Sequence, residues 1–215
     1  MSSKLLDRET VKGMFKQEWY SRWLQVLLVA VMVTCGSIAT SAQSSNDWVR
    51  HYRGKFAFFV TRDPRFAADI HRYLAQLIPC WGQTKLLCKG DLAATASSYM
   101  TNSTDDAVQF QGELSTVWGC GNHGGECAMF WSSSTKSTSR KPSLALCIIA
   151  DKLWVYTSGD SDRSMPPQLR HSIQSWRKSL EEEGFFMRPE AAFLVTRDGK
   201  VHALTLDTLN PQVVK

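Results

Sequence analysis

Two cysteines that bracket a histidine are the residues of this chain best suited to chemistry. Thiolate and imidazole groups are zinc ligands, so Cys120, His123 and Cys127 could hold a metal. A free thiolate beside a histidine could act as a nucleophile. A disulfide would instead close a ring that presents its tip to a partner or merely staples a hairpin. The residues between the cysteines are Gly121, Asn122, His123, Gly124, Gly125 and Glu126.

The N-terminal 42 residues indicate export. A basic lead is followed by 24 residues, 23–46, without Lys, Arg, Asp or Glu. The apolar centre Leu24–Val33 and the small residues up to Ala42 are typical of a signal cleaved after Ala42. A membrane span needs roughly 20 apolar residues, so residues 23–42 also fit a short anchor. We expect a periplasmic domain or, as an alternative, one anchored in the inner membrane. A cytosolic protein with a buried helix is the third reading.

Export changes what the cysteines are expected to do. In an oxidising compartment the sequence-local pairs are Cys120 with Cys127 and Cys80 with Cys88, although four cysteines allow three connectivities. Cys147 lies in an apolar run, where a free thiol packs as a small hydrophobe.

The segment 120–127, called the cysteine loop below, therefore fits a disulfide ring better than a metal or thiol site. Only three possible metal ligands lie close together in the sequence, one fewer than a structural zinc site needs. A disulfide also removes the thiolate that a nucleophile would require. Closing such a ring restricts the unfolded chain by about 2.5 kcal/mol on a loop-entropy argument. A preformed tip also loses less entropy on binding. We expect a rigid recognition loop or a stapled hairpin without a role in binding, with no catalytic residue, metal or cofactor, in a protein that is not an enzyme.

Charge argues against a nucleic-acid partner. The formal net charge is +5, and residues 1–42 carry five Lys/Arg and three Asp/Glu. The rest of the chain then has 25 − 5 = 20 basic and 20 − 3 = 17 acidic residues, a net charge of +3. That excess is too small to indicate a nucleic-acid-binding surface.

Helical spacing predicts two amphipathic helices. The first helix begins with Asp63 as the N-cap and Pro64 as its first residue, and it runs for about four turns and ends before Pro79. The second begins near Pro167 and ends at Gly184. Its apolar face is Leu169, Ile173, Trp176 and Leu180.

Alternating or continuous apolar runs predict a set of strands. Short or polar connections between them favour antiparallel pairing, and Asp198-Gly199 is a strong hairpin signal. Residues 80–105 carry the weakest secondary-structure signal: residues 80–82 and 88–91 are interpreted as loop, and residues 97–106 are polar and turn-rich. Phe56–Val60 is interpreted as a short strand or a staple before the first helix. The predicted strands are 108–118, 128–131, 144–149, 153–157, 192–196 and 201–205.

Two smaller features have structural interpretations. Trp118, Trp131, Trp154 and Trp176 fall on expected core faces, which favours packing over ligand binding. The phrase Ala-Phe-x-Val-Thr-Arg-Asp occurs at 57–63 and again at 192–198, either by coincidence or as two like-shaped edge strands.

The region of the cysteine loop resembles a known family. Gly112–Cys120, then His123, then Cys127–Trp131 is similar to the inhibitor of vertebrate lysozyme family, Ivy-type proteins of the bacterial periplasm. Residues 63–77 and the strand pair at 144–157 add weaker support, so the resemblance covers roughly residues 60–180.

The resemblance implies that His123 enters the active-site cleft of a lysozyme-type muramidase and contacts its catalytic carboxylates. The ring here is Cys-x6-Cys where the family has Cys-x4-Cys. Gly121-Asn122 precedes the histidine where the family has Lys-Pro. The alternative function is a membrane-anchored accessory or structural domain of an envelope secretion or conjugation machine. Whether the chain forms a homodimer is left open.

These observations predict an α+β fold with an antiparallel sheet of four to six strands. An N-terminal and a C-terminal helix flank the sheet, and the cysteine loop protrudes as a disulfide-stapled hairpin. We expect a cytoplasmic lead plus signal peptide or anchor at 1–42, a lysozyme-inhibitor-like domain at 48–184 and a C-terminal β-hairpin extension at 185–215.

Overall fold

The computed structural model describes residues 47–80, 86–103, 107–122, 125–133, 143–159, 165–185 and 188–210. The predicted signal or anchor at 1–42, with its apolar segment 23–42, lies outside the described residues, as do His123 and Gly124. Within the described ranges, no helix combines the length and the apolar character needed to cross a membrane.

Ser44–Lys215 form one compact unit, distinct from Met1–Gln43. All the strands, both hydrophobic clusters and both disulfides described below lie within Ser44–Lys215. Because these contacts are all internal, we expect this part of the chain to fold by itself.

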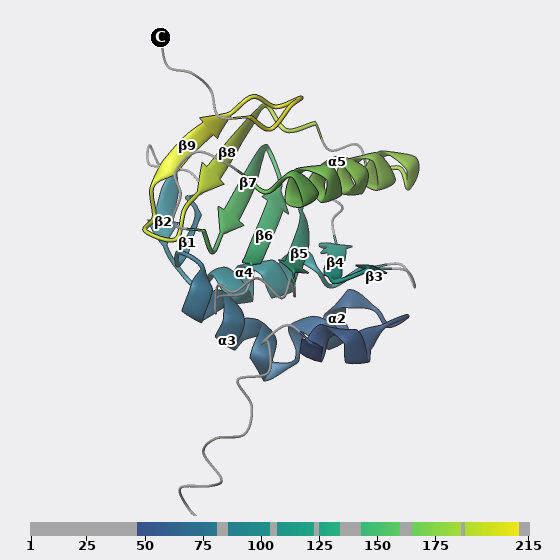
Figure 1. Cartoon of the computed structure of the whole chain (residues 1–215). Helices are drawn as coiled ribbons and strands as arrows, with labels where there is room; N and C mark the ends of the chain where they lie inside the picture. Colours follow the sequence, from purple (N-terminus) through teal and green to yellow (C-terminus); the bar gives the residue numbers. More distant parts are fainter. Residues whose placement is uncertain are drawn as a thin grey trace, which may run out of the picture. The chain divides into compact units, whose positions relative to one another are not determined.

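The described residues form a mixed seven-stranded sheet in which chain order equals spatial order (Figure 1). Every neighbouring pair is antiparallel except β7 with β8, which is parallel. The expectation of four to six antiparallel strands is therefore corrected. The strands are β3 (Val108–Gln111), β4 (Leu114–Cys120), β5 (Cys127–Ser133), β6 (Ser143–Ile149), β7 (Lys152–Thr157), β8 (Ala191–Val195) and β9 (Val201–Leu204).

A helical crossover explains the parallel pair. Helix α5 (Pro167–Glu182) lies between β7 and β8 in the chain, and a connection of that length can return the chain to the same end of the sheet. The Asp-Gly hairpin predicted within 185–215 is present as β8 and β9, with Gly199 at φ +82° in the turn. It continues the main sheet through β7 and is part of the same compact unit.

Helices cover both faces of the sheet (Figure 1). One face packs against η1 (Asp47–Tyr52), α2 (Ala57–Thr61), α3 (Pro64–Tyr73) and α4 (Leu92–Tyr99). The other face packs against α5 through its predicted apolar residues, all of which are buried. Strand β5 is buried along its whole length. The predicted core positions of Trp118, Trp131, Trp154 and Trp176 are confirmed, since each is at most 4% exposed.

The first predicted helix begins where expected but is shorter. Asp63 accepts a hydrogen bond from the Arg65 backbone N–H at 2.8 Å, which confirms the N-cap. The helix ends at Tyr73, because the Gln76 side chain donates to the carbonyls of Ile70 and Leu74 and so caps the last turn. The chain then enters β1 (Leu77–Pro79), which pairs with β2 (Leu87–Lys89) in a separate two-stranded sheet.

Helix α4 lies in the stretch 80–105, for which the sequence predicted no helix. Asp91 caps it by accepting from the Ala94 N–H at 3.0 Å. Leu92, Ala93 and Ala96 bury against the core. The helix was missed because its small and polar residues give almost no helical periodicity, so tertiary packing decides its structure.

Two further expectations are corrected. Residues 108–118 are not one strand, since Gly112 at φ +61° turns the chain between β3 and β4. Residues 56–60 are not a strand, because helix α2 begins at Ala57. The repeated phrase therefore forms a helix at 57–61 and a strand at 191–195, which leaves coincidence as its explanation.

Candidate functional site

The cysteine loop joins the ends of β4 and β5. Cys120 and Cys127 are directly opposed in the sheet, their Cα atoms lie 4.0 Å apart, and they form a disulfide. Both are fully buried and face the core under α5, together with Trp118 and Met129. The predicted staple is thus present but lies in the core, not at an exposed tip.

The segment after α4 pairs with the end of β4, on the side opposite β5. Strand β3 pairs with β4 only as far as Val117. Beyond Val117, Asn102 pairs with Cys120: the Asn102 N–H donates to the Cys120 carbonyl at 2.8 Å, and the Cys120 N–H donates to the Asn102 carbonyl at 2.6 Å. The strand end that carries the loop therefore has backbone partners on both sides.

Gly119 allows this close approach. A Cβ atom at this position would lie 2.8 Å from the Asn102 carbonyl oxygen and 3.0 Å from Met100 Cα. Both are backbone atoms, which cannot move aside as a flexible side chain can. The absence of a side chain at residue 119 is thus what lets the segment after α4 run along β4.

The entry to the loop is hydrogen-bonded as well. The Gly121 N–H donates to the Glu126 carbonyl at 2.8 Å, which extends the ladder one step past the disulfide. Asn122 Oδ1 accepts from Asn102 Nδ2 at 3.0 Å and lies 3.3 Å from Thr101 Oγ1. The side chain of Asn122 is exposed, so these bonds hold a polar group at the surface.

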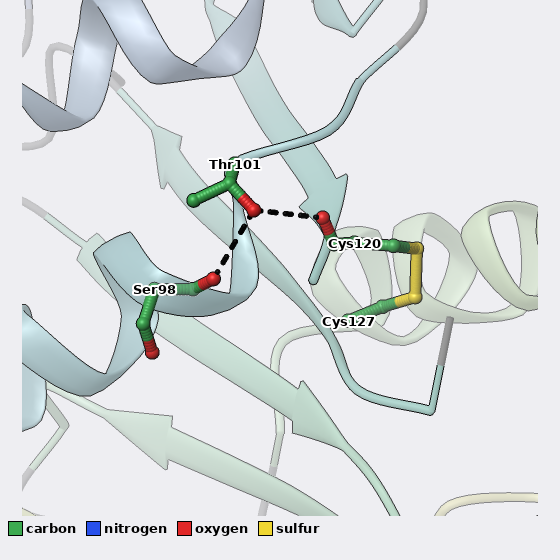
Figure 2. The surroundings of a disulfide bond; sticks show 4 residues. All are labelled: Ser98, Thr101, Cys120 and Cys127. Atoms are coloured by element: carbon green, nitrogen blue, oxygen red, sulfur yellow. Dashed lines mark hydrogen bonds between the residues drawn. A yellow bond between two sulfur atoms is a disulfide. The ribbon is translucent and has the colours of Figure 1, made fainter. Parts of the chain in front are cut away.

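Thr101 lies between the helix and the loop (Figure 2). Its Oγ1 is 3.4 Å from the Ser98 carbonyl and 3.5 Å from the Cys120 carbonyl. The single hydroxyl proton can serve only one acceptor at a time, so Thr101 can donate either to the Ser98 carbonyl of α4 or to the Cys120 carbonyl of β4. Sequence reasoning missed Thr101 and Asn102, because nothing in their local pattern links them to a loop 20 residues later.

The disulfide limits what the cysteine loop can do chemically. It uses both thiols, so neither a thiolate nucleophile nor a Cys2His metal site is available while the bond is intact. Gly125 is exposed and Glu126 is half-buried at the far side of the loop. Among the described residues, no cluster of three or more His, Cys, Asp or Glu side chains could bind a metal ion.

The other cysteines are structural. Cys80, the residue after β1, forms a disulfide with Cys88 of β2, and both are half-buried. Cys147 is a free thiol that is fully buried under α5, as predicted. Burial raises its pKa far above the ordinary value for a thiol, so it stays protonated and unreactive.

The most strongly perturbed buried carboxyl groups belong to α3 and its cap, not to the loop. Asp63 accepts from Arg65 Nε at 2.9 Å and Nη2 at 2.6 Å and from the Tyr52 hydroxyl at 2.8 Å, and hydrogen bonding by Arg65 lowers the pKa of Asp63 to about 2. Burial raises the pKa of Asp69, which accepts from Trp48 Nε1 at 3.0 Å. These bonds fix η1 on α3, which is a structural role.

A groove of about 260 Å³ opens between α5 and the β3–β5 part of the sheet. Trp118 and Trp176 contribute aromatic surface, and Gln109, Thr116 and Ser175 contribute polar groups. The groove reaches the strand that leads into the cysteine loop, since Trp118 is two residues before Cys120. The sequence predicted Trp118 and Trp176 as packed core tryptophans, not as residues that line a groove.

Comparisons of the chain with family models, with curated proteins and with solved structures found no match.

Proposed function

We propose that this protein acts in the bacterial envelope as a proteinaceous inhibitor of a lysozyme-type muramidase, and that the cysteine loop is the inserting element. The resemblance of Gly112–Trp131 to the Ivy-type family suggests the partner. His123, at the centre of the loop, is the residue proposed to reach the catalytic carboxylates.

The observation that carries the proposal is the double attachment of Cys120. A disulfide joins it to Cys127 on one side, and two backbone hydrogen bonds join it to Asn102 on the other. An inserting loop must keep its position against the walls of a cleft. Fixing the base of the cysteine loop before binding reduces the conformational entropy that the loop loses on association.

The chemistry of the target suits a histidine. Lysozymes use two carboxyl groups, one protonated as a general acid and one ionised. An imidazole placed between them can donate a hydrogen bond to the ionised carboxylate and accept one from the acid. Substrate is then excluded because the loop occupies the cleft.

The proposal is tested with purified residues 44–215 in a muramidase assay against several lysozyme types. We expect saturable inhibition by the oxidised protein and loss of inhibition after the Cys120–Cys127 bond is reduced. A matched control is the Cys80→Ser/Cys88→Ser variant, which removes the other disulfide and leaves the loop intact. Unchanged muramidase activity at every protein concentration would refute the proposal.

An alternative function is a membrane-anchored accessory domain of an envelope machine. One observation favours it: Asp47, the first residue of η1, lies only five residues after Ala42, the end of the possible anchor 23–42. That spacer keeps the start of the domain within at most about 20 Å of a membrane if the anchor is retained. Mass determination of the mature protein decides this point, because a cleaved chain lacks residues 1–42.

A further inference from the structure

Helix α2 and the residue before it present three phenylalanines that the core does not use. Ala57 and Val60 are the buried residues of the helix. Phe56 and Phe59 are 40% and 43% exposed, and Phe58 is half-buried. We call Phe56, Phe58 and Phe59 the phenylalanine patch. In the described part of the chain, the other exposed large hydrophobic residues are Leu86 and Val201.

The three rings form one cluster. The centroids of Phe58 and Phe59 lie 4.1 Å apart, and those of Phe56 and Phe58 lie 6.3 Å apart. Adjacent exposed apolar rings on a soluble protein form a candidate site of contact with a protein or a membrane. Singly scattered residues such as Leu86 and Val201 carry no such meaning.

Positive charge surrounds the patch in the sequence. Between Asp47 and Asp63 there are four Lys/Arg residues and no Asp or Glu. Arg53, Lys55 and Arg62 are exposed, and Arg62 Cζ lies 5.2 Å from the centre of the Phe58 ring. Asp63, the nearest carboxylate along the chain, is 7% exposed and already bound by Arg65 and Tyr52, so it offers little to offset this charge at the surface.

Aromatic side chains flanked by cations match one partner in particular. Phenylalanines bury in the boundary between headgroups and acyl chains, while Lys and Arg keep their charges among anionic headgroups. A protein partner would need an acidic rim around an apolar pocket, whereas an anionic bilayer supplies both features over any area.

The position of the patch in the chain is compatible with this partner. Lys55, directly before the patch, lies 13 residues after Ala42, where the possible anchor 23–42 ends. If that segment is retained as an anchor, the linking chain spans at most about 45 Å and keeps α2 near the bilayer surface.

We propose that the phenylalanine patch, with Lys55 and Arg62, docks Ser44–Lys215 onto the surface of an anionic lipid bilayer. The contact is interfacial: the rings enter the headgroup region, and the cations pair with lipid phosphates. Docking in this way would restrict the orientation of the domain at the membrane. It is independent of the proposed inhibitory activity, because α2 and the cysteine loop share no residue.

The test is co-sedimentation of residues 44–215 with vesicles. We expect binding to phosphatidylethanolamine/phosphatidylglycerol vesicles, weaker binding to phosphatidylcholine vesicles, and a decrease as salt concentration rises. The Phe56→Ser/Phe59→Ser variant should lose at least about tenfold in partition coefficient. Charge reversal in Lys55→Glu/Arg62→Glu should also lose about tenfold or more, because each cation near an anionic surface adds to the attraction.

Matched control variants make the same kinds of substitution at exposed residues outside the phenylalanine patch. Leu86→Ser/Val201→Ser deletes the other two exposed apolar residues, and Lys178→Glu/Arg188→Glu reverses two exposed cations outside the patch. Both should bind vesicles more strongly than the patch variants, and circular dichroism should show all four folded. Absence of vesicle binding by the wild type, or equal losses in patch and control variants, overturns the proposal. Loss of a dimer in Phe56→Ser/Phe59→Ser without vesicle binding assigns the patch to self-association instead.

Discussion

Asn102 and Cys120 exchange two backbone hydrogen bonds, of 2.8 and 2.6 Å, across the edge of β4 that β3 leaves open. The residue that anchors the cysteine loop therefore has the disulfide to Cys127 on one side and a backbone bridge on the other. This double attachment sets the position of the loop base and has measurable consequences.

Gly119→Ala should destabilise the protein by about 1–3 kcal/mol, because the new Cβ would meet the backbone of Asn102 and Met100. Urea unfolding measures the change. Gly125→Ala is the matched control within the same loop, since nothing lies within 4 Å of a Cβ there. Equal stability of the two variants would show that residues 100–102 do not hold β4 closely.

Asn102→Ala should leave global stability nearly unchanged but weaken muramidase inhibition several-fold. The substitution removes the 3.0 Å bond to Asn122 Oδ1 and keeps the backbone bridge, and an exposed hydrogen bond contributes about 1 kcal/mol or less. Asn210→Ala, at another exposed asparagine, is the control. Inhibition unaltered by Asn102→Ala would mean that ordering of Asn122 is irrelevant to binding.

The two disulfides should differ in their resistance to reduction. Cys80 and Cys88 are half-buried, whereas Cys120 and Cys127 are fully buried and hidden from an attacking thiolate. Under native conditions dithiothreitol should open Cys80–Cys88 first, as followed by alkylation and mass spectrometry. Cys147 should remain unlabelled until the protein is unfolded. Simultaneous reduction of both bonds in the folded protein would contradict the buried position of the staple.

The cap of α3 should make stability depend on pH. The folded-state pKa of Asp63 is about 2, below its ordinary value, so its ionised form contributes stability above pH 4 that is lost as the pH falls from about 4 to 2. Asp63→Asn should therefore cost about 2 kcal/mol at pH 7 and much less at pH 2. Urea titrations at the two pH values measure the difference.

Substitution of Asp69, the other perturbed carboxyl group of α3, should have a different effect from substitution of Asp63. Burial raises its folded-state pKa, so ionisation of Asp69 works against folding as the pH rises above the ordinary aspartate pKa. Asp69→Asn keeps an oxygen for Trp48 Nε1 and should be neutral or stabilising at pH 7. Equal losses for the two substitutions in urea titrations at pH 7 would contradict this assignment.

Local signals in the sequence predicted much of the fold. The Asp63 cap, the apolar face of α5 and the Asp-Gly hairpin each depend on a few neighbouring residues, and the structure contains all three. The parallel β7–β8 pair was missed because pairing direction depends on where the chain returns after α5. The order of strand, helix and strand from 152 to 195 was compatible with that crossover.

The candidate site was only half visible in the sequence. Two cysteines seven residues apart predicted a staple, and the structure contains it. Its burial under α5 and the bridge from Asn102 depend on contacts between segments distant in the sequence. Helix α4 had one readable signal, the Asp91 cap, but no amphipathic pattern to support it.

The most direct test of the central claim is a muramidase titration with residues 44–215 as wild type, His123→Ala and His171→Ala. His171 is an exposed histidine of α5 and serves as the matched control. The account predicts inhibition by the wild type and by His171→Ala, with a loss of at least about tenfold for His123→Ala, as expected for a central contact residue. Muramidase activity unchanged by the wild-type protein across several lysozyme types, or equal inhibition by all three proteins, would contradict it.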